Sequence, residues 1–238
     1  MAAAFGMDSR QAEALRRYVD LLLGWRRANV TGVRGRDEAA DRLLGDSLAL
    51  LDVGALHCAG TRWLDLGAGA GIPGIPLAVA RTTSNLTLLE ASAKKCAFLE
   101  AAVVEADVAD RAAVVCARSE EYAAARPAGA GDAAAGREAF DVVFARAVAS
   151  LAAVVELAAP LLAAGGVLLA VKSADGAAAE AHDGDAAATR CGLSPGVAEA
   201  LERSPLAGSV CVVYTKRTAA PAWLPRRPGV AAKRPLTS

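Results

Sequence analysis

The segment 61–80 (TRWLDLGAGAGIPGIPLAVA) contains the residue types best suited to binding a nucleotide-like ligand. A short apolar run reaches Asp65, and three glycines follow at alternate positions, Gly67, Gly69 and Gly71. Glycine lets the backbone turn sharply and approach a ligand more closely than a β-carbon would permit. The prolines that come next suit the first turn of a helix, whose unpaired N–H groups attract polar ligands. The sequence therefore predicts a strand, a ligand-binding glycine loop and a helix in succession.

Two classes of ligand fit this loop, depending on the register in which it is read. From Gly69 to Gly74 the sequence matches G-x-G-x-x-G, the dinucleotide fingerprint. From Asp65 it gives D-x-G-x-G-x-G, the loop of methyltransferases that use S-adenosylmethionine. Both registers require an acidic residue at the end of the next strand, where Glu90 can accept hydrogen bonds from ribose hydroxyls.

Three features favour the methyltransferase register. The dinucleotide register would leave Asp65 and Gly67 inside a strand, where both residue types are unfavourable. It would also place Pro73 directly before the third glycine, where the backbone should pack against the sheet. The Gly165-Gly166 pair before a hydrophobic strand is typical of the methyltransferase core. A NAD-type oxidoreductase remains the alternative.

The elements around the loop alternate between strands and helices. Residues 8–57 have helical periodicity, and they predict an N-terminal helical extension, assigned to residues 1–58. A main α/β domain is expected over 59–218, with a parallel sheet covered by helices on both faces. Its predicted strands are Arg62–Leu66, Leu86–Glu90, Ala113–Cys116, Asp141–Ala145, Val167–Lys172 and Val210–Lys216. Its predicted helices are 75–81, 93–106, 150–163 and 177–190. The Ala/Gly-rich stretch 123–139 is interpreted as a loop insertion.

One apolar stretch imitates a membrane span. Residues 147–171 carry a single charge, Glu156, but Pro160 and the Gly165-Gly166 pair divide the stretch into a helix and a short strand. The N-terminus reaches Asp8 and Ser9 without the apolar run of a signal peptide. We therefore expect a cytoplasmic protein without a membrane partner.

The sequence offers no constellation for metal or acid–base chemistry. Its five cysteines contain no C-x-x-C pair, and it has only two histidines. We interpret the cysteines as buried, inert thiols and expect neither a disulfide framework nor a metal site. No catalytic residue is predicted.

Charge is distributed unevenly along a chain whose formal net charge is zero. Residues 201–238 hold seven basic side chains against one acid, Glu202. The final part, 219–238, is predicted to be a basic tail that presents Arg226, Arg227 and Lys233 to phosphates. A merely solubilising tail is the alternative.

Several stretches together resemble one family, the 16S rRNA guanine-N7 methyltransferase G family, also called glucose-inhibited division protein B. The resemblance runs in order along nearly the whole chain. The stretches are Asn29-Val30-Thr31, Arg42 with Asp46-Ser47-Leu48, LDLGAGAGIPGIPLA at 64–78, LLEASAKKCAFL at 88–99, Ala117 to Glu121, FDVVFARAVASL at 140–151, Val171-Lys172, and PRRPGVAAKRPL at 225–236.

The resemblance implies a Rossmann-like class I methyltransferase fold, S-adenosylmethionine as cofactor, and 16S ribosomal RNA or the small ribosomal subunit as partner. It implies cofactor contacts by the glycine loop, the ends of the second and third strands, and an arginine after the fourth strand, which could also face the RNA. These residues are Gly67, Gly69, Gly71, Ile72, Glu90, Ser119, Glu120 and Arg146. Lys172 joins Arg226, Arg227 and Lys233 as an expected RNA contact, with a strand-end lysine of no special function as its alternative. Guanine N7 carries a lone pair and no proton, so the implied reaction needs no general base.

The chain departs from the family pattern at one motif. The family usually has histidine after the arginine of R-H-x-x-D-S, whereas Leu43 follows Arg42 here. This departure leaves room for an RNA-binding assembly factor that has lost turnover. A methyltransferase acting on a small molecule or a protein is a further alternative, which the basic tail disfavours.

Overall fold

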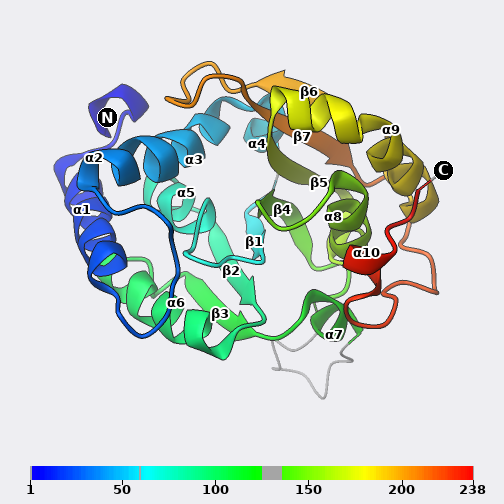
Figure 1. Ribbon diagram of the computed structural model, residues 1–238, viewed down its shortest axis with the longest axis horizontal. Coiled ribbons are helices and arrows are strands. Elements are labelled where there is room, and N and C mark those ends of the chain that lie inside the picture. The colour runs from blue at the N-terminus through cyan, green and yellow to red at the C-terminus, as the bar shows by residue number, and fades with distance from the viewer. Residues whose placement is uncertain (1, 59, 125–135, 238) are drawn as a thin grey trace.

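The computed structural model describes residues 2–58, 60–124 and 136–237, which form a seven-stranded sheet with helices on both faces (Figure 1). The strand order is β3-β2-β1-β4-β5-β7-β6. Strands β1 to β5 are parallel, whereas β7 is antiparallel to β5 and β6 is antiparallel to β7. The strands are β1 (Arg62–Leu66), β2 (Asn85–Glu90), β3 (Ala112–Cys116), β4 (Phe140–Arg146), β5 (Leu162–Ser173), β6 (Val197–Ala200) and β7 (Ser209–Thr215).

The six predicted strands are confirmed, but the expectation of a wholly parallel sheet is wrong at one edge. Strand β7 runs antiparallel to β5, and the apolar pattern of a strand is the same for either direction, so this direction could not be predicted. The short strand β6 was missed because its residues Val197–Ala200 are mostly exposed and carry no apolar run. The Ala/Gly-rich insertion predicted at 123–139 falls largely on 125–135, outside the described residues.

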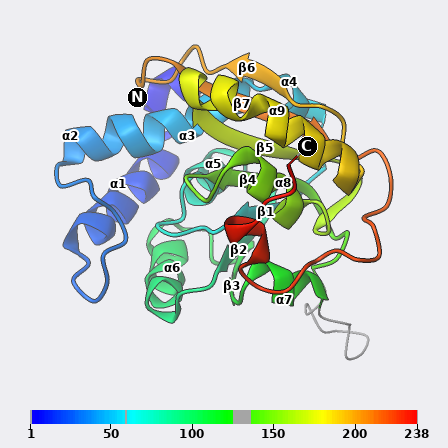
Figure 2. The ribbon, with the colours of Figure 1, turned by 45° about the vertical axis from the view of Figure 1, so that its right-hand side comes forward.

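Alternating side chains of the strands supply two hydrophobic cores, one on each face of the sheet. In β1, Trp63 packs into one core while Leu64 and Leu66 pack into the other. The first core is covered by α5 (Gly74–Ala80), α6 (Ala93–Glu105) and the N-terminal helices. The second is covered by α7 (Ser119–Ala124), α8 (Leu151–Ala158) and α9 (Ala174–Cys191), as Figure 2 shows from the side.

The N-terminal extension is helical, as predicted, and it is packed onto the first core. Helix α1 (Ser9–Gly24) begins at a capping box formed by Asp8 and Gln11, and its apolar face buries Tyr18 and Leu22. The Tyr18 hydroxyl donates a hydrogen bond to the carbonyl oxygen of Ala70 in the glycine loop at 2.7 Å. Short helical segments complete the extension: η1 (Ala2–Phe5), α2 (Arg36–Ala39), the π-helical η2 (Ala40–Gly45), α3 (Asp46–Leu48), η3 (Ala49–Asp52) and α4 (Gly54–Cys58).

The C-terminal segment is folded against the second core, and the prediction of a freely presented basic tail is wrong for much of it. Leu224 and Leu236 are buried in that core, and α10 (Val230–Lys233) lies beside α8. The Arg137 guanidinium donates to the carbonyl oxygen of Leu224 at 2.7 Å. Lys216, counted as part of the basic end, is only 2% exposed and donates to the carbonyl oxygen of Ala159.

The expectation of five inert thiols is also wrong in part. Cys96 and Cys116 are joined by a disulfide between α6 and the end of β3. The two cysteines lie far apart in sequence and meet because β3 pairs with β2, placing Cys116 opposite Glu90. Cys191 and Cys211 are buried free thiols, and burial raises the pKa of Cys191 to about 12. Within the described ranges, no helix is both long and apolar enough to cross a membrane.

Candidate cofactor site at the carboxyl edge of the sheet

The glycine loop after β1 requires glycine for reasons that the structure makes explicit. Gly67, Gly69 and Gly71 all have positive φ angles, of +67°, +56° and +82°, which L-residues with side chains rarely adopt. At Gly71 an added β-carbon would also lie 2.4 Å from the Cδ1 atom of Ile75. The loop therefore owes its path to the glycines themselves.

Asp65 fixes the inner end of the loop. Its side chain is buried, and its Oδ2 atom accepts a hydrogen bond from the backbone N–H of Gly74 at 2.9 Å. Its Oδ1 atom has no hydrogen-bond partner among the described residues. Burial raises the pKa of Asp65 to about 7, although the Gly74 N–H and the nearby Arg146 charge act in the opposite direction. Gly74 therefore lies close against the first strand at Asp65, where an added β-carbon would be 2.8 Å from Oδ2.

Glu90 fixes the outer side of the loop. Its Oε2 atom accepts a hydrogen bond from the N–H of Gly69 at 2.9 Å, and its Oε1 atom accepts one from Ser92 at 2.8 Å. A carboxylate has about four acceptor sites, so two are left for a ligand. Glu90 therefore orders the glycine loop and still presents acceptor capacity to the pocket beside it.

A pocket opens at this edge of the sheet, where open α/β sheets bind their ligands. Residues of the loops after β1, β2, β3 and β4 line it, together with Leu157 of α8 and two residues of the C-terminal segment. Four of the predicted cofactor contacts lie in its wall: Gly67, Glu90, Ser119 and Glu120. The walls are largely apolar, and their acidic groups are the carboxylates of Glu90 and Glu120.

The other predicted contacts occupy different places. Gly69 and Gly71 shape the loop behind the pocket rather than lining it. Ile72 is buried in the first hydrophobic core and does not line the pocket. The sequence motif therefore contains both residues that face the pocket and residues that support them.

Glu120 links the pocket to a distant part of the chain. Its Oε2 atom accepts a hydrogen bond from the Ser119 hydroxyl at 3.1 Å. Its Oε1 atom accepts one from the backbone N–H of Gly229 at 2.7 Å. The wall predicted to meet the adenine is thus tied to the C-terminal segment.

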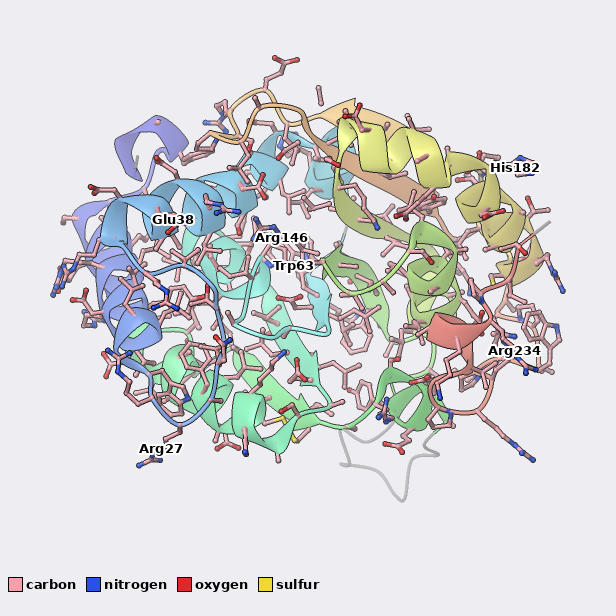
Figure 3. The ribbon with its side chains drawn as sticks, viewed as in Figure 1. Arg27, Glu38, Trp63, Arg146, His182 and Arg234 are labelled. Carbon is pink, nitrogen blue, oxygen red and sulfur yellow. A yellow bond between two sulfur atoms is a disulfide. The ribbon has the colours of Figure 1, made fainter. Side chains whose placement is uncertain are left out.

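Arg146 lies at the end of β4, where it meets the N-terminal extension (Figure 3). Its guanidinium forms an ion pair with the buried Asp46 at 2.9 Å and donates to the carbonyl oxygen of Arg42 at 2.7 Å. Asp46 also accepts a hydrogen bond from the Ser204 hydroxyl at 2.7 Å. Two stretches that resembled the family separately, around Arg42 and around Arg146, are therefore in direct contact. The π-helical turn Ala40–Gly45 holds them, and such turns often occur at functional sites.

The predicted RNA-binding residues divide into two groups. Arg226 forms a bidentate ion pair with Glu156 of α8, so it is not presented as an unpaired cation, and its contact with RNA stays a prediction. The buried Glu156, the single charge of an apolar stretch, supplies the compensating charge that the tail itself lacks. Arg227 and Lys233 are exposed, and in the described parts of the chain neither has an ion-pair partner.

Lys172 is not a free cation either. Its ammonium donates to Glu180 of α9 at 2.9 Å and to the carbonyl oxygen of Ala149 at 2.9 Å. Glu180 also accepts from the N–H of Leu151. Lys172 therefore fixes the loop that connects β4 to α8, which forms part of the pocket wall.

Comparison with known proteins agrees with this geometry. The family model of rRNA small subunit methyltransferase G (GidB) matches residues 11–204. The chain belongs to this family. A ribosomal RNA small subunit methyltransferase G from Roseiflexus castenholzii is 36% identical, covering 99% of this chain and 97% of that protein. The corresponding protein of Rubrobacter xylanophilus is 37% identical, covering 95% and 84%.

Solved structures show the same fold. A cofactor-bound protein from MTB, Rv0187, superposes with a TM-score of 0.51 at 23% identity, covering 89% of this chain and 91% of that one. A predicted O-methyltransferase from Agrobacterium tumefaciens, Atu636, gives a TM-score of 0.51 at 24% identity, covering 75% and 81%. The predicted methyltransferase fold is thereby confirmed, and the N-terminal helical extension is seen in this chain itself.

Some supporting residues were missed by sequence reasoning. Tyr18 and Asp46 support the glycine loop and Arg146, whereas Glu156 and Gly229 hold the C-terminal segment. Asp46 could have been predicted from the sequence, because it lies in a stretch that resembles the family. Glu156 could also have been predicted, because an isolated charge in an apolar helix needs a partner when it is buried.

Proposed function

We propose that this chain transfers a methyl group from S-adenosylmethionine to N7 of a guanine in 16S ribosomal RNA. Membership of the methyltransferase G family supports the reaction class and the rRNA substrate. The observation that carries the proposal is the pocket between Gly67 and Glu90, in which the glycine loop is bonded to the carboxylate beside it.

The pocket suits this cofactor by its hydrogen-bond acceptors and by the close backbone approach that its glycine allows. Glu90 would accept hydrogen bonds from the ribose hydroxyls, as its remaining acceptor sites allow. Gly67 would let the backbone approach the methionine end, while Ser119 and Glu120 would meet the adenine. Arg146 and Ile72 would act from behind, by holding the strand ends in place. The two wall carboxylates, Glu90 and Glu120, outnumber the one lining arginine, Arg118, which favours a cationic sulfonium over a neutral ligand.

The proposed reaction needs no general acid or base from the chain. S-adenosylmethionine, when bound, supplies an electrophilic methyl group, and guanine N7 supplies a lone pair without losing a proton. The chain's residues then need to align the two partners and exclude water. No residue is assigned as a catalytic acid or base. The described residues contain no cluster of side chains that could hold a metal.

The rRNA would be contacted by cations near the pocket. Arg227 and Lys233 belong to the segment that borders the pocket, and both are exposed. Lys172 would contact RNA only by exchanging Glu180 for a phosphate. The substrate would be 16S rRNA alone or within the small subunit, and the protein would then act in the cytoplasm, without a membrane partner.

Mass mapping of 16S rRNA tests the function directly. Cells lacking the gene should lose one methyl group on a guanine, and the intact gene should restore it. A Gly69→Val gene should fail to restore the methyl group while producing folded protein. An unchanged methylation map in the deletion strain would refute the proposal. Cofactor binding without a missing methyl group would instead favour the assembly factor that lacks turnover.

A further inference from the structure

The cofactor pocket has one wall that comes from the far end of the chain. Gly229 and Ala232 line the same pocket as Gly67 and Glu90, although about 140 to 165 residues separate them in sequence. The short helix α10 lies beside α7 and α8 in both Figure 1 and Figure 2. The C-terminal segment Leu224–Leu236 therefore borders a site that sequence reasoning assigned to the main domain alone.

Two polar contacts determine where this segment lies. The backbone N–H of Gly229 donates to Oε1 of Glu120 at 2.7 Å. The Arg226 guanidinium donates to the carbonyl oxygen of Arg234, eight residues further along, at 2.7 Å, which closes the segment on itself. Arg226 in turn pairs with both carboxylate oxygens of Glu156. The Gly229 hydrogen bond thus joins the segment to the pocket wall, and the Arg226–Glu156 pair joins it to α8 behind that wall.

The ion pair between Arg226 and Glu156 is the main polar contact that holds the C-terminal segment against α8. The Glu156 side chain is only 2% exposed, and Arg226 is 25% exposed. A buried carboxylate without its cation is strongly unfavourable, so undocking of the segment would leave Glu156 uncompensated. Helix α10 has four residues and cannot be stable by itself. The pair, together with buried Leu224 and Leu236, thus decides whether the segment covers the pocket.

We propose that the C-terminal segment Leu224–Leu236 is part of the cofactor-binding site, and that Glu156 and Arg226 are the positioning residues that hold it there. The ligand is the adenosyl cofactor of the proposed function, on which this inference rests. Gly229 and Ala232 form the inner side of the segment, while Arg227 and Lys233 form its solvent side. Loss of the Arg226–Glu156 ion pair removes one wall of the pocket and leaves the glycine loop intact.

Binding and docking are then linked. A cofactor that contacts the docked segment binds the docked state more tightly than the undocked state, so it shifts the segment toward docking. The reverse also follows, because a variant that undocks more often binds the cofactor more weakly. Each direction gives an independent measurement.

The first measurement compares two adjacent arginines. Calorimetric titration with S-adenosylmethionine should show at least about a tenfold loss of affinity for Arg226→Ala, a change of about 1.4 kcal/mol. Arg227→Ala, which removes the same charge from the next residue, should bind as the wild type does. With saturating cofactor, kcat of Arg226→Ala should stay near the wild-type value while KM for the cofactor rises. Equal affinities for the two variants and the wild type would overturn the proposal.

Combining Arg226→Ala with Glu156→Gln tests whether the two residues affect cofactor binding through one ion pair or independently. Glu156→Gln should lose affinity as Arg226→Ala does, and the double variant should lose no more than the larger single loss. Fully additive losses would show that the two residues act separately, which contradicts the proposal. Thermal unfolding of all variants identifies any that do not fold.

The second measurement needs no variant. Trypsin can cleave the wild-type chain after Lys233, which lies in the docked segment, and after Arg27, which points away from the molecule (Figure 3). S-adenosylmethionine should slow cleavage after Lys233 several-fold, because cleavage requires local opening, and leave cleavage after Arg27 unchanged. Intact-protein mass spectrometry distinguishes the two products. Bound cofactor without protection at Lys233 would overturn the inference, whereas failure of the wild type to bind cofactor would overturn the proposed function instead.

Discussion

The glycine loop and the C-terminal segment border the same pocket but are held in place in different ways. The loop is shaped by residues within about 25 positions of one another, through the positive φ angles of its glycines and the bonds to Asp65 and Glu90. The segment is held by partners about 70 to 110 positions away, Glu156 and Glu120. A site can thus combine a wall that is determined locally with one that exists only in the folded chain.

The difference is clearest in the two neighbouring arginines of the segment. Arg226 is paired with a buried carboxylate, whereas Arg227 is exposed without an ion-pair partner among the described residues. Their residue type and their place in the sequence are nearly the same. Their roles differ because α8 places Glu156 where it pairs with Arg226 and not with Arg227.

The largest expected effect concerns the pocket wall formed by the glycine loop. Gly69→Val places a β-branched residue at a φ of +56°, which strains the loop and disturbs the hydrogen bond to Glu90. S-adenosylmethionine affinity should fall on the order of a hundredfold, or about 2.8 kcal/mol. Gly165→Val is the matched control, because Gly165 has a φ of +75°, open space around its β-carbon position and no place in the pocket. If both variants bind cofactor equally in calorimetry, the loop is not the cofactor site.

The next effect concerns pH and the buried Asp65. Its pKa of about 7 in the folded chain lies above its ordinary value of 3.8, so the folded state binds the proton more tightly. Asp65 therefore stabilises the fold below about pH 4, and this contribution is lost as the pH rises through 7. Asp65→Asn mimics the protonated form and keeps an acceptor for Gly74.

Urea unfolding at pH 4 and pH 8 measures this effect. The variant should gain stability relative to the wild type between the two pH values, on the order of a few kcal/mol. A difference between the two proteins that is the same at both pH values would show that the pKa of Asp65 is not raised in the folded state.

A smaller effect is expected from Glu90→Gln. The change preserves side-chain size but weakens charge-assisted hydrogen bonds to the ribose, so cofactor binding should lose about 1–3 kcal/mol. Glu121→Gln is a suitable control, because Glu121 also accepts a backbone hydrogen bond, from Arg118, but does not line the pocket. Calorimetry showing the same loss for both would assign Glu90 a structural role only.

The smallest effect concerns the solvent side of the C-terminal segment. Arg227→Ala with Lys233→Ala should weaken binding of 16S rRNA while leaving cofactor affinity unchanged. The slope of log affinity against log salt should become shallower by up to about 1.5, because two phosphate contacts are lost. Arg217→Ala, an exposed arginine after β7, is the control. Coincident salt curves for the double variant and the wild type would leave the two cations without an RNA role.

Most elements of the main domain were predictable because their signals are local. Strand β1 was predicted at its observed bounds, and α6 within one residue, since apolar runs and helical periodicity lie within single elements. The antiparallel direction of β7 and the exposed strand β6 were not predictable in this way. Their placement depends on which neighbour each strand meets, and a short strand's own residues do not encode that.

The sequence by itself determined the glycine loop, the acidic residue at the end of β2 and the family to which the chain belongs. These features depend on residue type and short spacing, which backbone conformation and hydrogen-bonding capacity impose directly. Only the tertiary structure decided the fate of individual charges: Arg146 with Asp46, Lys172 with Glu180, and Arg226 with Glu156. A charge has no fixed role until burial and a partner give it one, because its free energy depends on the solvent and the opposite charge around it.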